Sequence, residues 1–139
     1  MVHFNLAGRV NSEDYAICER LLDILSVTLL DFTVSKTPYR QDRWSSEAVE
    51  LTRIYGFRVP TSANLVICDV IVWSDTGRLL CTDVDAFSTF VERHYGVQLD
   101  LSEAEVMLYI KANMDEMRLE QQQQQQQQRA DAASVAAIS

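Results

Sequence analysis

The segment that decides the fold runs from Asn64 to Tyr95 and reads NLVICDVIVWSDTGRLLCTDVDAFSTFVERHY. Its first part, from Leu65 to Trp73, is a nearly unbroken apolar run, which predicts a buried β-strand. The turn-forming residues Ser74-Asp75-Thr76-Gly77 separate this run from a second one, Arg78-Leu79-Leu80-Cys81. The two runs therefore predict an antiparallel hairpin whose first strand lies at the centre of a sheet.

A helix is predicted directly after this hairpin. Asp83 is placed to accept hydrogen bonds from the free N–H groups at a helix start, and Gly96 is placed to end the helix. Four residues between them share one helical face, which we expect to cover one side of the hairpin: Phe87, Phe90, Val91 and His94.

Composition favours one compact domain with a tail. The chain has 139 residues, of which 47% are hydrophobic, so it can bury a core without a metal ion or disulfides. Twelve basic and 20 acidic residues give a net charge of −8, which opposes binding to the phosphates of nucleic acids and to anionic membranes. We therefore expect protein partners and neither nucleic acid nor membrane binding.

The three cysteines, Cys18, Cys68 and Cys81, are odd in number, scattered and set among apolar residues. This pattern predicts reduced, buried thiols with no metal site and no cofactor. No basic segment followed by an apolar core opens the chain, and no apolar run approaches the roughly 20 residues that span a bilayer. We expect a cytoplasmic protein.

The first part of the chain predicts a strand, a helix and a second strand. Polar and apolar residues alternate from Val2 to Ala7 and from Phe32 to Lys36, and Thr37-Pro38-Tyr39 is expected to end the second strand. Asn11 or Ser12 can cap the intervening helix, which favours a parallel crossover. The apolar face of that helix is predicted to contain Ile17, Leu21, Ile24, Leu25 and Thr28.

A second helix is predicted to start between Asp42 and Ser46 and to end at Tyr55, before Gly56. Its apolar face contains Trp44, Ala48, Leu51 and Tyr55. The element order is then strand, helix, strand, helix, strand, strand, helix, which is the order of a thioredoxin-like fold. We predict an α/β protein with a mixed four-stranded sheet, flanking helices and a C-terminal helical extension.

The extension begins with a capping box from Ser102 to Glu105. A stripe at helical spacing follows and is expected to pack in the core: Val106, Met107, Ile110, Met114 and Met117. The predicted organisation is a domain over residues 1–100, a C-terminal helix over 101–120, and a Gln/Ala-rich tail over 121–139 that is either helical or disordered.

Several segments carry a family resemblance: Phe4 to Arg9, Ser12 to Ala16, Trp73 to Phe87, and His94-Tyr95. In order and spacing they resemble the N-terminal, glutaredoxin-like domain of the malate dehydrogenase 1B family. The dinucleotide-binding Gly-x-Gly-x-x-Gly pattern does not follow any predicted strand of this chain, so the resemblance does not extend to dehydrogenase activity.

Comparison with glutaredoxins indicates a lost redox site. A thiol oxidoreductase needs a cysteine at the start of the first helix, where this chain has Ser12-Glu13-Asp14-Tyr15. The proline that precedes the third strand in such folds falls near Ser62-Ala63, with Pro60 displaced. The Gly-Gly pair that binds glutathione corresponds to Thr82-Asp83, where Asp83 would repel the glutathione carboxylate.

We therefore predict a non-catalytic interaction or structural module. Its predicted partner-contact residues are Ser12, Glu13, Asp14, Tyr15, Ala63, Thr82 and Asp83. The family resemblance implies motile cilia and flagella, and hence axonemal or microtubule-associated partners. The alternative is a thiol or glutathione-linked oxidoreductase that uses Cys18, Cys68 or Cys81. A third possibility is that the chain is a fragment of a longer dehydrogenase-like protein.

Two other features of the sequence bear on function. Asp69 interrupts the central apolar run and is either a buried functional carboxylate or, as we favour, a residue at an edge or in a turn towards solvent. Four arginines lie along the second helix and its flanks and are expected to form a solvated face, which is also the concentrated basic surface open to an acidic partner: Arg40, Arg43, Arg53 and Arg58.

Overall fold

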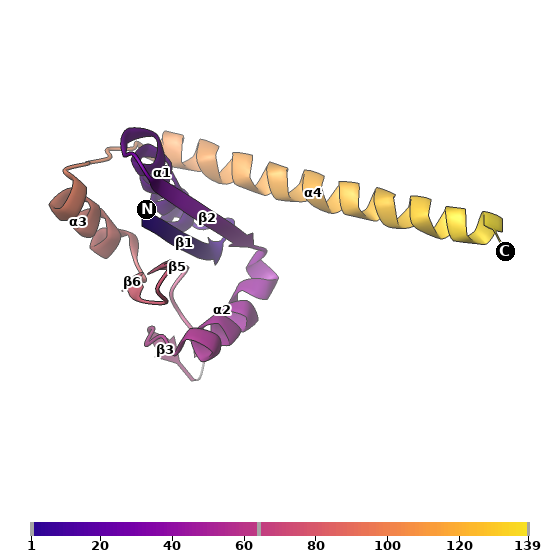
Figure 1. The fold of residues 1–139 in the computed structure, drawn as a ribbon, viewed down its shortest axis with the longest axis horizontal. Helices are drawn as coiled ribbons and strands as arrows, with labels where there is room; N and C mark the ends of the chain where they lie inside the picture. Colours follow the sequence, from indigo (N-terminus) through magenta and orange to yellow (C-terminus); the bar gives the residue numbers. More distant parts are fainter. Residues whose placement is uncertain (1, 64, 139) are drawn as a thin grey trace.

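The computed structural model describes residues 2–63 and 65–138. A four-stranded mixed sheet lies at its centre, in the order β2-β1-β5-β6 (Figure 1). β1 pairs in parallel with β2 and antiparallel with β5, and β5 pairs antiparallel with β6. The strands are β1 (Val2–Arg9), β2 (Phe32–Tyr39), β5 (Val70–Ser74) and β6 (Leu79–Cys81). This arrangement confirms the predicted thioredoxin-like fold.

Helices cover both faces of the sheet. α1 (Glu13–Thr28) and α3 (Val84–Tyr95) pack on one face, where Val70 and Val72 of β5 are buried with them. α2 (Gln41–Tyr55) packs on the other face, against Ile71 and Trp73. Successive side chains of a strand point to opposite faces, so β5 contributes to both cores and is buried between them.

The predicted starts of α1 and α3 and the predicted ends of α2 and α3 are confirmed, whereas α2 begins at Gln41, one residue before the predicted range of Asp42 to Ser46. The Ser12 hydroxyl accepts a hydrogen bond from the Asp14 N–H at 3.1 Å at the start of α1. Asp83 accepts one from the Ala86 N–H at 2.7 Å at the start of α3. Gly56 and Gly96 end α2 and α3 with φ angles of 71° and 68°, a left-handed conformation that glycine adopts without the cost that other residues incur.

The long apolar run does not form one strand, which corrects the sequence-based prediction. It divides into β4 (Leu65–Val66), which pairs with β3 (Thr61–Ser62) in a separate two-stranded sheet, and β5. Between them, the carbonyls of Cys68 and Asp69 accept hydrogen bonds from the Trp44 indole at 2.8 Å and from the Arg9 N–H at 3.0 Å. Those contacts hold the loop outside the ladder of strands.

Three smaller predictions also need correction. β2 continues through Pro38 to Tyr39. Proline is tolerated there because β2 is an edge strand that pairs with β1 alone, so the N–H that proline lacks is not needed for hydrogen bonds to a second strand. Thr28 is exposed, since the end of α1 extends past the core. On α3, Phe87 and Val91 are fully buried, whereas Phe90 is half-buried and stacks on the exposed His94 ring with centroids 4.2 Å apart.

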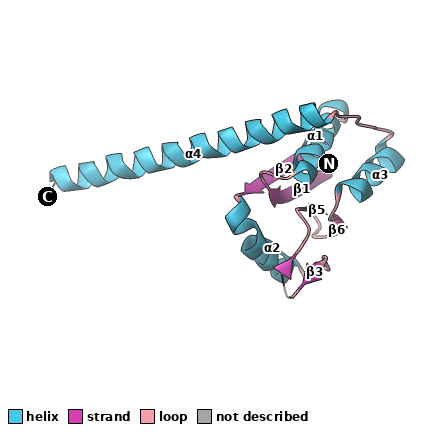
Figure 2. Ribbon diagram, turned by 180° about the vertical axis from the view of Figure 1, so that it is seen from behind, coloured by secondary structure: helices cyan, strands magenta, loops and turns pink. Residues whose placement is uncertain are grey.

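α4 (Glu103–Ile138) starts against the domain and then leaves it. Ser102 caps it by accepting from the Glu105 N–H at 3.2 Å, and Val106 and Ile110 pack against Ala16 of α1. Further along, the helix projects as an arm that includes the glutamine run (Figures 1 and 2). Met107 is 57% exposed and Met114 39%, so these two residues do not belong to the packed stripe. None of the helices described has an apolar stretch long enough to cross a membrane.

Candidate functional site

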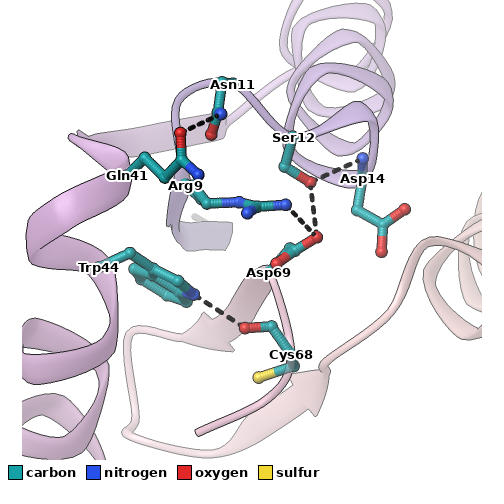
Figure 3. A network of polar contacts seen from close by, with 8 residues as sticks. All are labelled: Arg9, Asn11, Ser12, Asp14, Gln41, Trp44, Cys68 and Asp69. Carbon is teal, nitrogen blue, oxygen red and sulfur yellow. Dashed lines mark hydrogen bonds and ion pairs between the residues drawn. The ribbon is translucent and has the colours of Figure 1, made fainter.

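The start of α1 meets the loop that precedes β5. The Ser12 hydroxyl donates a hydrogen bond to Oδ2 of Asp69 at 3.3 Å while it caps the helix. The Arg9 guanidinium, at the end of β1, donates to the same oxygen at 3.0 Å (Figure 3). The end of β1 and the start of α1, which are close in sequence, thus converge on one carboxylate that lies 60 and 57 residues further along the chain.

Gly8 allows this loop to approach β1 closely. A Cβ atom at Gly8 would lie 2.6 Å from Cδ2 of Tyr15 and 2.8 Å from the carbonyl oxygen of Asp69, closer than real contacts permit. The Trp44 indole holds the preceding residue through the Cys68 carbonyl (Figure 3). The Asp69 side chain is therefore positioned by its backbone as well as by Arg9.

Carboxylates gather around the start of α1. Burial raises the pKa of the Asp14 carboxyl above its ordinary value, and the negative charges of neighbouring acidic residues raise it further. We call these five residues the acidic cluster: Glu13, Asp14, Asp69, Asp83 and Asp85. Within the described chain, Arg9 forms the cluster's one ion pair, so the surface there has a net negative charge.

The structure brings some of the predicted contact residues together and separates others. Ser12 is 3% exposed and directly precedes Glu13 and Asp14 at the start of α1. Thr82 directly precedes Asp83 at the start of α3. Tyr15 is fully buried among the core residues between α1 and the sheet, so it cannot contact a partner, contrary to prediction.

Ala63 also lies away from this site. It follows β3 on the small hairpin beside α2, with a φ angle of 51°. Asp69, rather than Ala63, supplies the side chain that meets Ser12. Asp69 stands out in the sequence because it interrupts an apolar run. The role of Arg9 was not predicted, because its partner Asp69 is 60 residues away in sequence.

All three cysteines are free thiols. Burial, the main cause in each case, raises the pKa of the Cys18 thiol strongly and raises those of Cys68 and Cys81 to about 11. Thiolate, the reactive form, is therefore scarce at neutral pH. The Cys68 side chain points away from Ser12 (Figure 3).

The described residues contain no group of three or more His, Cys, Asp or Glu side chains arranged to hold a metal ion.

A match to a protein family spans most of the chain. Residues 3–130 match the family described as "Putative malate dehydrogenase 1B N-terminal domain". No dehydrogenase domain is matched in the 139 residues. Comparison with curated proteins finds no significant match. The chain therefore belongs to the family of malate dehydrogenase 1B N-terminal domains.

Proposed function

We propose that this domain is a non-catalytic interaction module, which binds a basic surface of a partner protein through the acidic cluster. One observation carries the proposal: the Ser12 hydroxyl, bound to Asp69 at 3.3 Å, occupies the helix start where redox enzymes of this fold need a cysteine. A serine oxygen cannot form a mixed disulfide.

The surroundings of Ser12 also favour binding over thiol chemistry. Carboxylates at the start of the helix oppose both a thiolate and the carboxylates of glutathione through like-charge repulsion. The same charges attract lysine and arginine side chains. Because Asp14 and Asp83 come from the starts of two different helices, a basic surface can contact both α1 and α3.

We further propose that the partner belongs to a ciliary or flagellar axoneme, as the family resemblance implies. The net charge of −8 opposes direct contact with the acidic surface of microtubules. A basic axonemal protein that lies between this domain and the microtubule would be attracted to the acidic surfaces of both. The domain would then be a structural component beside other axonemal proteins.

A disulfide-reduction assay separates this proposal from the oxidoreductase alternative. Purified full-length protein with glutathione and a small disulfide should give no turnover above the buffer control, because the raised pKa values leave few thiolates. Single replacements Cys18→Ala, Cys68→Ala and Cys81→Ala serve as controls. Turnover that one of these replacements abolishes would contradict the proposal and identify the relocated nucleophile.

A further inference from the structure

A groove of about 700 Å³ separates α4 from the start of α2. α4 runs past the end of β2 and the beginning of α2 before it leaves the domain (Figure 1). Val10, Met114 and Met117 supply apolar side chains to the groove, and Arg40 and Arg118 supply positive charge from opposite walls. The groove is separate from the acidic cluster, none of whose residues lines it.

The basic side chains of the groove are available to a ligand. Arg40 pairs with Asp42 at 2.9 Å and Arg118 with Asp115 at 3.4 Å, but both pairs are well exposed, so each contributes little and can exchange partners. Arg43 lines an adjoining hollow and forms no ion pair with any residue in the described ranges.

Polar groups of the α2 backbone and of Asn11 also lie at the groove, where they can bind a ligand. α2 begins at the groove, and Arg40 at its N-cap position makes no side-chain capping bond, so the N–H groups at the helix start have no side-chain cap. Asp42, in the first turn of α2, also lines the groove and offsets part of the positive charge there. Oδ1 of Asn11 is buried at the groove without a hydrogen-bond donor among the described residues. A peptide N–H group could supply that donor.

Met114 and Met117 suit a peptide more than a compact anion. Their flexible, polarisable side chains adapt to apolar groups of varied shape. We propose that this groove binds an acidic peptide segment of a partner protein, with its carboxylates on Arg40, Arg43 and Arg118 and an apolar side chain on the methionines. This second surface, of opposite charge to the acidic cluster, goes beyond the function proposed above.

Methyl NMR of the full-length chain tests the proposal directly. The probe is a capped peptide of alternating glutamate and leucine, and a lysine–leucine peptide of equal length is its charge control. The glutamate peptide should shift the Met114 and Met117 methyl signals saturably. Met107 is an internal control, because it is exposed on the same helix but does not line the groove.

Charge reversal completes the test. Arg43→Glu with Arg118→Glu should weaken binding of the glutamate peptide by about tenfold or more, because two favourable charges become repulsive. Arg53→Glu with Arg93→Glu, at exposed positions that do not line the groove, should leave binding unchanged. Equal binding of the lysine peptide, no shift at Met114 and Met117, or undiminished affinity after the groove reversal would each overturn the proposal.

Discussion

The Asp69 carboxylate accepts hydrogen bonds from the Ser12 hydroxyl at 3.3 Å and from the Arg9 guanidinium at 3.0 Å. These contacts tie the loop before β5 to the start of α1. The Ser12 hydroxyl is therefore held between the first turn of α1 and a charged side chain. The contacts have measurable consequences for stability, for charge and for binding.

Removal of the Asp69 carboxylate should destabilise the domain. We expect Asp69→Ala to lower the free energy of unfolding by about 1–2 kcal/mol, since the lost contacts involve a charge but are one-third exposed. Urea unfolding measures the change. Asp75→Ala, in an exposed turn, is the matched control. A loss at Asp69 no larger than that at Asp75 would mean that the contacts with Arg9 and Ser12 contribute nothing.

The pKa of Asp14 should report the acidic cluster. Neighbouring charges raise it, so Asp83→Asn with Asp85→Asn should lower it, and the asparagine oxygen at position 83 still caps α3. A ¹³C NMR titration of the carboxyl measures this. Because the pKa of Asp14 is higher in the folded protein than in the unfolded chain, ionised Asp14 lowers the free energy of unfolding. This destabilisation decreases as Asp14 is protonated, and it is gone once the pH is below 3.8, the pKa of the carboxyl in the unfolded chain. An unchanged pKa would show that these charges are not coupled.

Phe87 should contribute more to the core than Phe90. Phe87 is fully buried, so Phe87→Ala should cost about 3–5 kcal/mol, as large-to-small core replacements do. Phe90 is half-buried, and Phe90→Ala should cost roughly half as much. Reversible chemical unfolding compares the two. The opposite order of losses would place the buried face of α3 one turn away from Phe87.

Truncation after Leu119 should leave the thermal unfolding midpoint almost unchanged. The segment removed is polar over most of its length and is exposed from Gln122 to Ala130, so its loss uncovers little apolar area. Val106→Ala, on the buried face of α4, is the contrasting variant and should lower the midpoint. If truncation lowers the midpoint by as much as Val106→Ala, the arm stabilises the domain.

The order of elements was predictable because local chemistry specifies it. Ser12, Asp83 and Ser102 accept capping hydrogen bonds within three residues of their own positions, and Gly56 and Gly96 end helices through their own φ angles. Long-range contacts were not predictable in this way. The break at Cys68 and Asp69 depends on Trp44 and Arg9, which are 24 and 60 residues away along the chain.

The candidate site was predictable only in part for the same reason. Glu13 and Asp14 follow the cap of α1, and Asp83 is itself the cap of α3, so their location at helix starts follows from sequence. Tyr15 was misassigned because one residue along a helix turns the side chain by about 100°, here from solvent to core. Ala63 was misplaced because β3 and β4 form an additional hairpin before β5.

The central claim, that the acidic cluster binds a basic partner, is tested most directly by charge reversal in the native complex. The measurement is the fraction of protein retained in detergent-extracted axonemes when Glu13, Asp14 and Asp85 are all replaced by lysine, which leaves the caps Ser12 and Asp83 intact. Reversal of Glu50, Asp75 and Asp100, outside the cluster, is the matched control. We predict release of the cluster variant and retention of the control. Retention of a folded cluster variant at the wild-type level would contradict the account.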